Sequence, residues 1–278
     1  MKRFNGIALS VAFCSLASQA ALAQTKIDTL KVQNLNEVIV KGVRAAKEAP
    51  YAVANIRKSE LKQFSCSGQE LPFLLSRTPG ILAWSENGIG TGTTYMRIRG
   101  AAGSRINVTL DGVALNSPED QTVFWANMNS YSSLLGSIQV QRGVGSSTNG
   151  DGAFGGSISM ATAAPSLTPT AEVTGSFGSY NTYHTGASFS TGLLGKHLIF
   201  DGAYHETATD GYVDGTAGRS GSYYGGLTWL SDNFKVSYKN IGNFEKTGQA
   251  WNGVLGGDYN SNFSLLQDGI RTYKDMYK

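Results

Sequence analysis

The sequence carries little charge and has no long apolar run beyond its N-terminal region. Lys, Arg, Asp and Glu together make up 15% of the 278 residues, and the formal net charge is +3. The basic residues are scattered rather than gathered into a stripe, which argues against a nucleic-acid partner. After the N-terminal region no span is apolar enough for a transmembrane helix. These absences argue against a nucleic-acid partner and against a transmembrane helix beyond the N-terminal region.

Cysteine is almost absent as well, with two residues in the chain. Cys14 lies within residues 1–23, where a basic start, a short apolar stretch and an Ala-x-Ala site predict a secretory signal peptide cleaved before Gln24. An N-terminal membrane anchor is the alternative. Only Cys66 then remains, so the mature chain can form no internal disulfide, and no ligand spacing for zinc surrounds it.

Catalytic patterns are also missing. The spacing of His184, His197 and His205 matches neither a helical histidine pair nor a metal cluster. Residues 143–156 are rich in glycine but lack the Gly-Lys-Ser/Thr ending of a phosphate loop, and no Gly-x-Ser-x-Gly elbow is present. No Asp/Glu pair sits in a context that would set its two pKa values apart. We therefore expect a protein that is not an enzyme and has no cofactor and no metal site.

Glycine, by contrast, is abundant, with 35 residues. Between Tyr95 and Thr162, short alternating segments each end in a glycine turn, which predicts a compact, strand-rich unit. The glycines of residues 143–156 let the backbone turn tightly between two of these strands.

Three motifs in this unit have a recognisable order: Arg-Ile-Arg-Gly at 97–100, Leu-Asp-Gly-Val at 110–113, and Arg-Gly…Gly-Gly-Ser-Ile within 142–158. They resemble the plug domain of TonB-dependent outer-membrane receptors, and residues 118–128 are closest to receptors of the Bacteroidetes type. The resemblance runs from about residue 35 to residue 180. It implies a receptor whose plug is seated in a transmembrane β-barrel.

A β-branched hexamer precedes the plug motifs and has no strand partner nearby in the sequence. An unpaired edge strand is a liability unless another chain is meant to pair with it. The resemblance implies that this hexamer is the TonB box, which adds as a strand to the energy-transducing TonB protein. The alternative is an ordinary first strand of the plug. The hexamer consists of Leu35, Asn36, Glu37, Val38, Ile39 and Val40.

Arginines mark one face of the plug motifs. Arg97 and Arg99 alternate with apolar residues, and charged side chains cannot enter a dry core without acidic partners. We expect Arg97, Arg99 and Arg142 to make polar contacts between the plug and acids of the barrel wall. A solvent-facing basic surface that binds nothing is the alternative.

Beyond a proline-bounded hinge at 165–169 the pattern changes to longer dyad repeats, apolar and aromatic on one side and polar on the other. Such repeats are typical of strands that cross an outer membrane, and after one short loop the long and tight connections alternate, as extracellular loops and periplasmic turns do. A soluble antiparallel sandwich is the alternative. The expected strands are 171–177, 183–190, 198–205, 223–229 and 234–239.

The sequence thus predicts a mainly β fold: a small α/β plug domain followed by the first antiparallel strands of a transmembrane β-barrel. We expect a signal peptide at 1–23, a periplasmic arm at 24–50, the plug at 51–165, and barrel strands and loops at 166–278. Since plugged transporters use about 22 strands, this barrel would be incomplete.

The resemblance implies energy-coupled uptake of a scarce nutrient, such as an iron-siderophore, cobalamin or a glycan, at the outer membrane of a Gram-negative cell. The plug and arm would lie on the periplasmic side. Expected partners are the TonB protein, outer-membrane lipid, the small-molecule or glycan ligand and a surface lipoprotein. The alternative is a secreted or surface-attached β-rich adhesin or glycan-binding protein without transport.

Long irregular segments are the candidates for contact with the ligand, because binding residues concentrate on loops. These are Glu86–Thr94, Pro118–Trp125 and Thr207–Gly221. Phe124 and Trp125 could stack on a ring of the ligand, or else only pack the plug against the wall.

Overall fold

The structure, a computed structural model, describes residues 44–45, 52–144, 153–213, 215–231 and 233–248. The expected signal peptide at 1–23 and the hexamer Leu35–Val40 lie outside the described residues. All described residues belong to one compact unit, 37–278. In the described part of the chain, no helix has the length and apolar character needed to cross a membrane.

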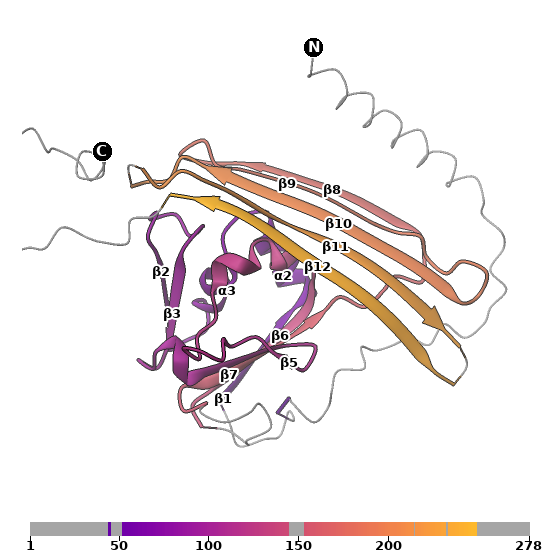
Figure 1. Cartoon of the computed structure of the whole chain (residues 1–278), viewed down its shortest axis with the longest axis horizontal. Coiled ribbons are helices and arrows are strands. Elements are labelled where there is room, and N and C mark those ends of the chain that lie inside the picture. The colour runs from indigo at the N-terminus through magenta and orange to yellow at the C-terminus, as the bar shows by residue number, and fades with distance from the viewer. Residues whose placement is uncertain (1–43, 46–51, 145–152, 214, 232, 249–278) are drawn as a thin grey trace, which may run out of the picture. The chain divides into compact units, whose positions relative to one another are not determined.

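The N-terminal half is built on a mixed five-stranded sheet of order β1-β6-β7-β4-β5 (Figure 1). Strands β4 and β7 pair in parallel, and the other neighbours pair antiparallel. Glycine-closed strands were expected here, and the structure has them. The strands are β1 (Ala52–Arg57), β4 (Ile106–Leu110), β5 (Val113–Ala114), β6 (Leu135–Arg142) and β7 (Gly156–Thr162).

Two short helices and a hairpin accompany this sheet. Leu61 and Phe64, one turn apart on the first helix, are buried against it, and Pro72 stands in the first turn of the second helix, where no backbone donor is needed. The helices are α2 (Lys58–Ser65) and α3 (Leu71–Leu75). The hairpin pairs β2 (Ile81–Ser85) with β3 (Thr94–Ile98), and the 3₁₀ turns are η1 (Gly103–Arg105), η2 (Trp125–Met128) and η3 (Tyr131–Ser133).

The two faces of the mixed sheet differ in chemistry. On one face apolar side chains of β6 and β7 are fully buried beneath α2, which packs on β1, β6 and η3. The other face is polar, because the alternate residues of the same strands are serine and glutamine. The apolar face includes Ile138, Val140, Ile158 and Met160, and the polar face includes Ser137, Gln139, Gln141, Ser157 and Ser159.

The C-terminal half is an antiparallel sheet whose five strands lie side by side in chain order, from β8 to β12 (Figure 1). All five were expected, although the last three, β10 to β12, are longer than the alternation indicated. The loop predicted at Thr207–Gly221 is shorter than expected. Residues 207–209 pair with 218–220, so the connection spans only 210–217. The strands are β8 (Thr170–Phe177), β9 (Tyr183–Ser190), β10 (Leu198–Thr209), β11 (Gly218–Leu230) and β12 (Lys235–Thr247).

This antiparallel sheet has an exposed apolar face and a covered polar face, the reverse of a water-soluble protein. Val173 and Phe177 are 85% and 83% exposed, whereas His184 and Ser222 are buried on the opposite face. Further exposed apolar residues are Phe200, Tyr204, Tyr223, Leu227, Trp229, Val236 and Tyr238, and further buried polar residues are Ser190, His205, Thr207, Ser220 and Thr228.

Aromatic rings on the exposed face lie over glycines of the neighbouring strand. In each case the ring and the glycine are directly opposite in the strand register, and a Cβ on the glycine would collide with the ring. Covering a glycine in this way compensates for the side chain it lacks. The pairs are Phe189 with Gly202, Tyr223 with Gly242 and Phe244 with Gly221.

Candidate functional site

The C-terminal end of α2 is attached to the antiparallel sheet by three contacts. The Nζ atom of Lys62 lies 2.8 Å from Oε1 of Glu172 on β8. The Ser176 hydroxyl donates a hydrogen bond to the carbonyl oxygen of Cys66. Gly68 adopts a φ of +69°, and a Cβ there would come within 3.0 Å of a methyl group of Thr207. Glycine is therefore required where the chain approaches β10 this closely.

A second attachment centres on Asp111, in the turn between β4 and β5. Its carboxylate accepts hydrogen bonds from the backbone N–H of Thr162 at 2.9 Å, from the Thr162 hydroxyl at 2.8 Å and from Nζ of Lys239 on β12 at 2.8 Å. Burial raises the pKa of Asp111, but these bonds outweigh it and hold the pKa below its usual value. The motif Leu-Asp-Gly-Val indicated a turn, and its carboxylate proves to be a link to β12.

Glu70, just ahead of α3, is a buried acid close to Glu245 of β12. Its carboxyl group is hydrogen-bonded to the Thr94 hydroxyl and, at 3.3 Å, to the side-chain amide of Asn129. Burial, opposed by the Thr94 bond and assisted by the nearby charge of Glu245 on β12, raises the pKa of Glu70 from 4.5 to about 8. Glu70 is therefore mostly neutral at pH 7, and sequence reasoning gave no signal for it.

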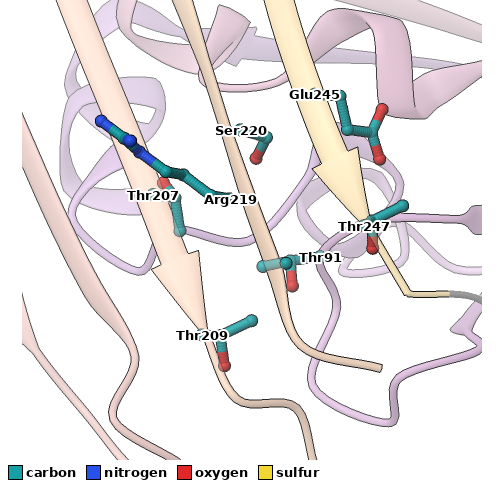
Figure 2. Close-up of a pocket in the computed structure, with 9 residues that line it drawn as sticks. Thr91, Thr207, Thr209, Arg219, Ser220, Glu245 and Thr247 are labelled. Atoms are coloured by element: carbon teal, nitrogen blue, oxygen red, sulfur yellow. The ribbon is translucent and has the colours of Figure 1, made fainter. Parts of the chain in front are cut away.

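A small polar gap lies where a plug loop meets β10, β11 and β12 (Figure 2). Hydroxyl groups and one carboxylate line it, a set that suits water. In the part of the chain that the structure describes, no three His, Cys, Asp or Glu side chains are grouped to hold a metal ion. The lining residues are Thr91, Gly92, Thr207, Thr209, Gly218, Arg219, Ser220, Glu245 and Thr247.

Two of the three segments expected to face the ligand meet at one end of the sheet. The Asn87 side chain accepts backbone hydrogen bonds from Ile89 at 3.1 Å and Gly90 at 3.2 Å, which fixes the loop between β2 and β3. The Asn87 carbonyl accepts a hydrogen bond from the N–H of Tyr212 at 3.0 Å. The ring of Tyr212 also meets that of Tyr180 edge to face at 5.5 Å. Contact of these loops with a ligand stays a prediction.

The aromatic pair in the third segment is split by a 3₁₀ turn. Phe124 is 56% exposed, but Trp125, the first residue of η2, is 5% exposed and belongs to the apolar core. Trp125 packs in this core and is too buried to offer its ring to a ligand in the described arrangement. Contact of Phe124 with a ligand stays a prediction.

The three arginines lie at the surface or partly buried. The guanidinium group of Arg97 lies 5.8 Å from the centre of the Trp84 ring, and that ring stacks on Tyr95 at 5.4 Å. Arg142 donates a hydrogen bond to the Pro79 carbonyl at 2.7 Å, and Arg99 is exposed. Among the described residues none of the three forms an ion pair with a carboxylate, so their pairing with wall acids stays a prediction. The sequence reasoning missed the face formed by Trp84, Tyr95 and Arg97.

His184 and His205 lie on the covered face of the antiparallel sheet and are buried. Their rings stack at 5.7 Å, and Nδ1 of His184 lies 2.9 Å from the Thr207 hydroxyl. His197, at the turn before β10, stacks on Trp229 at 5.2 Å.

Comparison with known proteins agrees with this architecture. The family model of the TonB-dependent receptor plug domain matches residues 45–157, which include α2, the β2–β3 hairpin and the Asp111 turn. The chain contains a TonB-dependent receptor plug domain. The match agrees with the expected plug domain, and the mainly β fold class is confirmed; TonB-dependent receptors with such a plug are transporters rather than enzymes. No curated protein matches the chain.

Solved structures resemble this chain at the level of the fold. FpvA of P. aeruginosa, bound to a heterologous pyoverdine and iron, is 18% identical over 73% of this chain, with a TM-score of 0.59. The ferric citrate transporter FecA is 20% identical over 76%, with a TM-score of 0.60. The ferric yersiniabactin uptake receptor FyuA from Yersinia pestis is 16% identical over 74%, with a TM-score of 0.56. This chain covers 26%, 33% and 34% of those three proteins.

Proposed function

We propose that the chain is the plug and the first membrane strands of an outer-membrane receptor for TonB-dependent uptake of a scarce nutrient. The observation that carries this proposal is the plug domain at residues 45–157, bonded through Lys62 and Asp111 to a sheet with an exposed apolar face. A sheet of that kind is stable when lipid covers its apolar side and a polar plug covers its other side.

The position of charges on the exposed face supports a membrane. The Arg219 guanidinium donates two hydrogen bonds of 2.8 Å to the Glu206 carboxylate. The hydroxyls of Tyr183 and Tyr204 also donate to that carboxylate. Lys246 lies directly opposite Arg219 in the strand register. These charges gather at one end of β10, β11 and β12, whereas the middle of the same face is occupied by apolar residues and glycines apart from Asn240. Charges at a boundary and an apolar band between boundaries are what a bilayer requires.

We propose that this end faces the cell exterior. It carries the connection at 210–217 and the turn at Tyr180, and the plug loop at Asn87 binds to the same connection. The N-terminal arm and the mixed sheet would then lie toward the periplasm, where the hexamer Leu35–Val40 could add as a strand to TonB. Ligand would enter from the side of the loops.

The substrate is proposed as a class: an iron-siderophore, cobalamin or a glycan. The names of FpvA, FecA and FyuA refer to iron chelates, and OprC, of similar fold, is a copper transporter. The exposed Phe124 and the face of Trp84 and Arg97 would suit a ligand that is both aromatic and anionic, through stacking and charge.

Deleting Leu35–Val40 from the full-length protein tests the proposal. We expect uptake of radiolabelled ferric chelates, cobalamin or oligosaccharides to be lost while binding at the cell surface is kept, because the deletion removes only the strand offered to TonB. A variant with the residues of the hexamer in reversed order controls for length and composition. Uptake that survives the deletion would contradict the proposed function.

A further inference from the structure

Arg44 and Ala45, just downstream of the hexamer, are hydrogen-bonded to the polar face of the mixed sheet. Arg44 donates four hydrogen bonds: to the hydroxyls of Ser159 at 3.2 Å and Ser137 at 3.0 Å, and to the carbonyls of Ser137 at 3.3 Å and Ser159 at 3.0 Å. The guanidinium group thus spans β6 and β7, which are neighbours inside the sheet rather than edge strands.

Gln139 completes the attachment through its side-chain amide. Its oxygen accepts a hydrogen bond from the backbone N–H of Ala45 at 2.8 Å, and its nitrogen donates to the Ala45 carbonyl at 3.2 Å. The same nitrogen lies 3.0 Å from the side-chain oxygen of Asn55 on β1. One glutamine therefore binds the arm, the edge strand β1 and its own strand β6 together.

The order of these contacts along the chain determines which part of the plug bears the force when the arm is pulled. Three residues separate Val40 from Arg44, whereas the first residue of β1 is Ala52. Tension applied at the hexamer therefore reaches Arg44 before it reaches β1. Without this attachment it would act on the end of β1, an edge strand that can be peeled away one hydrogen bond at a time.

We propose that Arg44, Ala45, Ser137, Gln139 and Ser159 form a clasp that carries the first load when TonB pulls, and that β1 is loaded only after the clasp opens. The proposal rests on the proposed function for the source of the pull, but the clasp itself is a property of this chain. Its bonds share the load, because a planar guanidinium engages two hydroxyls and two carbonyls at once. A lysine offers only a point charge at the same place.

Single-molecule pulling on the full-length receptor in lipid bilayers tests the clasp without TonB. A handle is attached at Asn34→Cys in a Cys66→Ser background, so the force enters through the arm. We expect an early rupture event that Arg44→Ala abolishes and Arg44→Lys weakens. Arg105→Ala removes an exposed arginine of the same plug and should leave the event unchanged. An early event that survives in Arg44→Ala, or is lost in Arg105→Ala too, would overturn the proposal.

Hydrogen exchange of the Ala45 amide gives a readout that a general loss of plug stability would not imitate. In Gln139→Leu this amide should exchange faster by about fivefold or more, as the loss of one net hydrogen bond predicts, while amides of β4 and β7 keep their rates. Equal acceleration throughout the plug would contradict a local clasp.

Uptake assays separate failure of the clasp from failure of the proposed function. If deletion of Leu35–Val40 leaves uptake intact, the TonB assignment is wrong whatever the pulling result. If that deletion abolishes uptake and Arg44→Ala has no effect on the early rupture event, the receptor assignment stands and the clasp is wrong.

Discussion

The two sheets of this chain bury opposite kinds of side chain on their covered faces. The mixed sheet buries Ile138 and Ile158 beneath a helix, as water-soluble domains do. The antiparallel sheet buries His184 and Ser222 and exposes Phe177 and Val173. Both kinds of strand alternate with the same period, so alternation alone does not tell a soluble sheet from a membrane sheet. The deciding observation is which side of each strand is covered.

The comparison also shows where each region obtains its stability. The apolar core of the plug lies mainly within its own sequence, since the hydrophobic effect is satisfied by α2, η2 and the mixed sheet together. The antiparallel sheet needs two different surroundings, an apolar medium on one face and polar groups on the other. The plug supplies part of the polar surroundings, through Lys62 and Asp111.

The largest expected effect comes from separating the two regions. Residues 24–165 expressed alone should stay soluble and at least partly folded, because their core is retained. Residues 24–278 should aggregate without detergent, because they add an exposed apolar face and a sheet whose two edge strands, β8 and β12, have no outer partner among the described residues. Size-exclusion chromatography and thermal melting distinguish the outcomes, and added detergent should return the longer fragment to a monodisperse state. A monomeric 24–278 fragment that melts cooperatively in plain buffer would refute the membrane interpretation of the second half.

A smaller effect is expected at Glu70, where the plug core borders the antiparallel sheet. Its pKa in the folded protein, about 8, lies above the usual 4.5. The neutral acid therefore contributes stability that is complete below pH 4.5 and is lost as the pH rises through 8. Between these limits the free energy of unfolding should fall by up to about 1.4 kcal/mol per pH unit, and Glu70→Gln should flatten the slope.

Urea unfolding of the full chain in detergent, followed by tryptophan fluorescence between pH 5 and pH 8.5, measures this slope. Glu119→Gln replaces an exposed glutamate of the same plug and should keep the wild-type dependence. Glu245→Gln should end the fall in stability at a lower pH, because the charge of Glu245 helps to raise the pKa of Glu70. Parallel pH profiles for wild type and Glu70→Gln would disprove the assignment of a neutral buried acid.

The smallest effects concern the two ion pairs that join the regions. Lys239 and Asp111 are 30% and 35% exposed, and the pair is supported by Thr162, so Lys239→Met should lower the free energy of unfolding by about 1–3 kcal/mol. Lys62 and Glu172 are 62% and 43% exposed, and Lys62→Met should cost less than about 1 kcal/mol. Double-mutant cycles with Asp111→Asn and Glu172→Gln test the ranking. A larger coupling energy for Lys62–Glu172 than for Lys239–Asp111 would contradict this ranking.

Much of this architecture could be predicted from the sequence, for identifiable reasons. The five antiparallel strands were found because a side-chain period of two survives in any half-covered strand. The plug was found because three glycine-containing motifs keep their order. Strand ends were less accurate: β10 and β11 continue past the apolar alternation, since the backbone hydrogen bonds at Thr207–Thr209 do not depend on side-chain polarity.

The parts of the site that the sequence did not reveal depend on contacts between residues far apart in the chain or on the local path of the backbone. Asp111 and Lys239 meet although 128 positions separate them, and no pattern links them. Phe124 and Trp125 are adjacent and similar, yet a 3₁₀ turn places one outside and one in the core. Arg44 lies in a stretch with no periodic pattern, so nothing in the sequence distinguished it from other surface arginines.

The pairing of aromatic rings with glycines has a consequence for how the antiparallel sheet assembles. Phe189 fits over Gly202, Tyr223 over Gly242, and a slip of two residues along a strand would keep every side chain on its proper face but press these rings against side chains instead. Hydrophobic patterning tolerates such a slip, whereas these ring–glycine fits do not. The correct alignment of neighbouring strands is thus set by the fit of these rings over glycines as well as by the hydrophobic pattern.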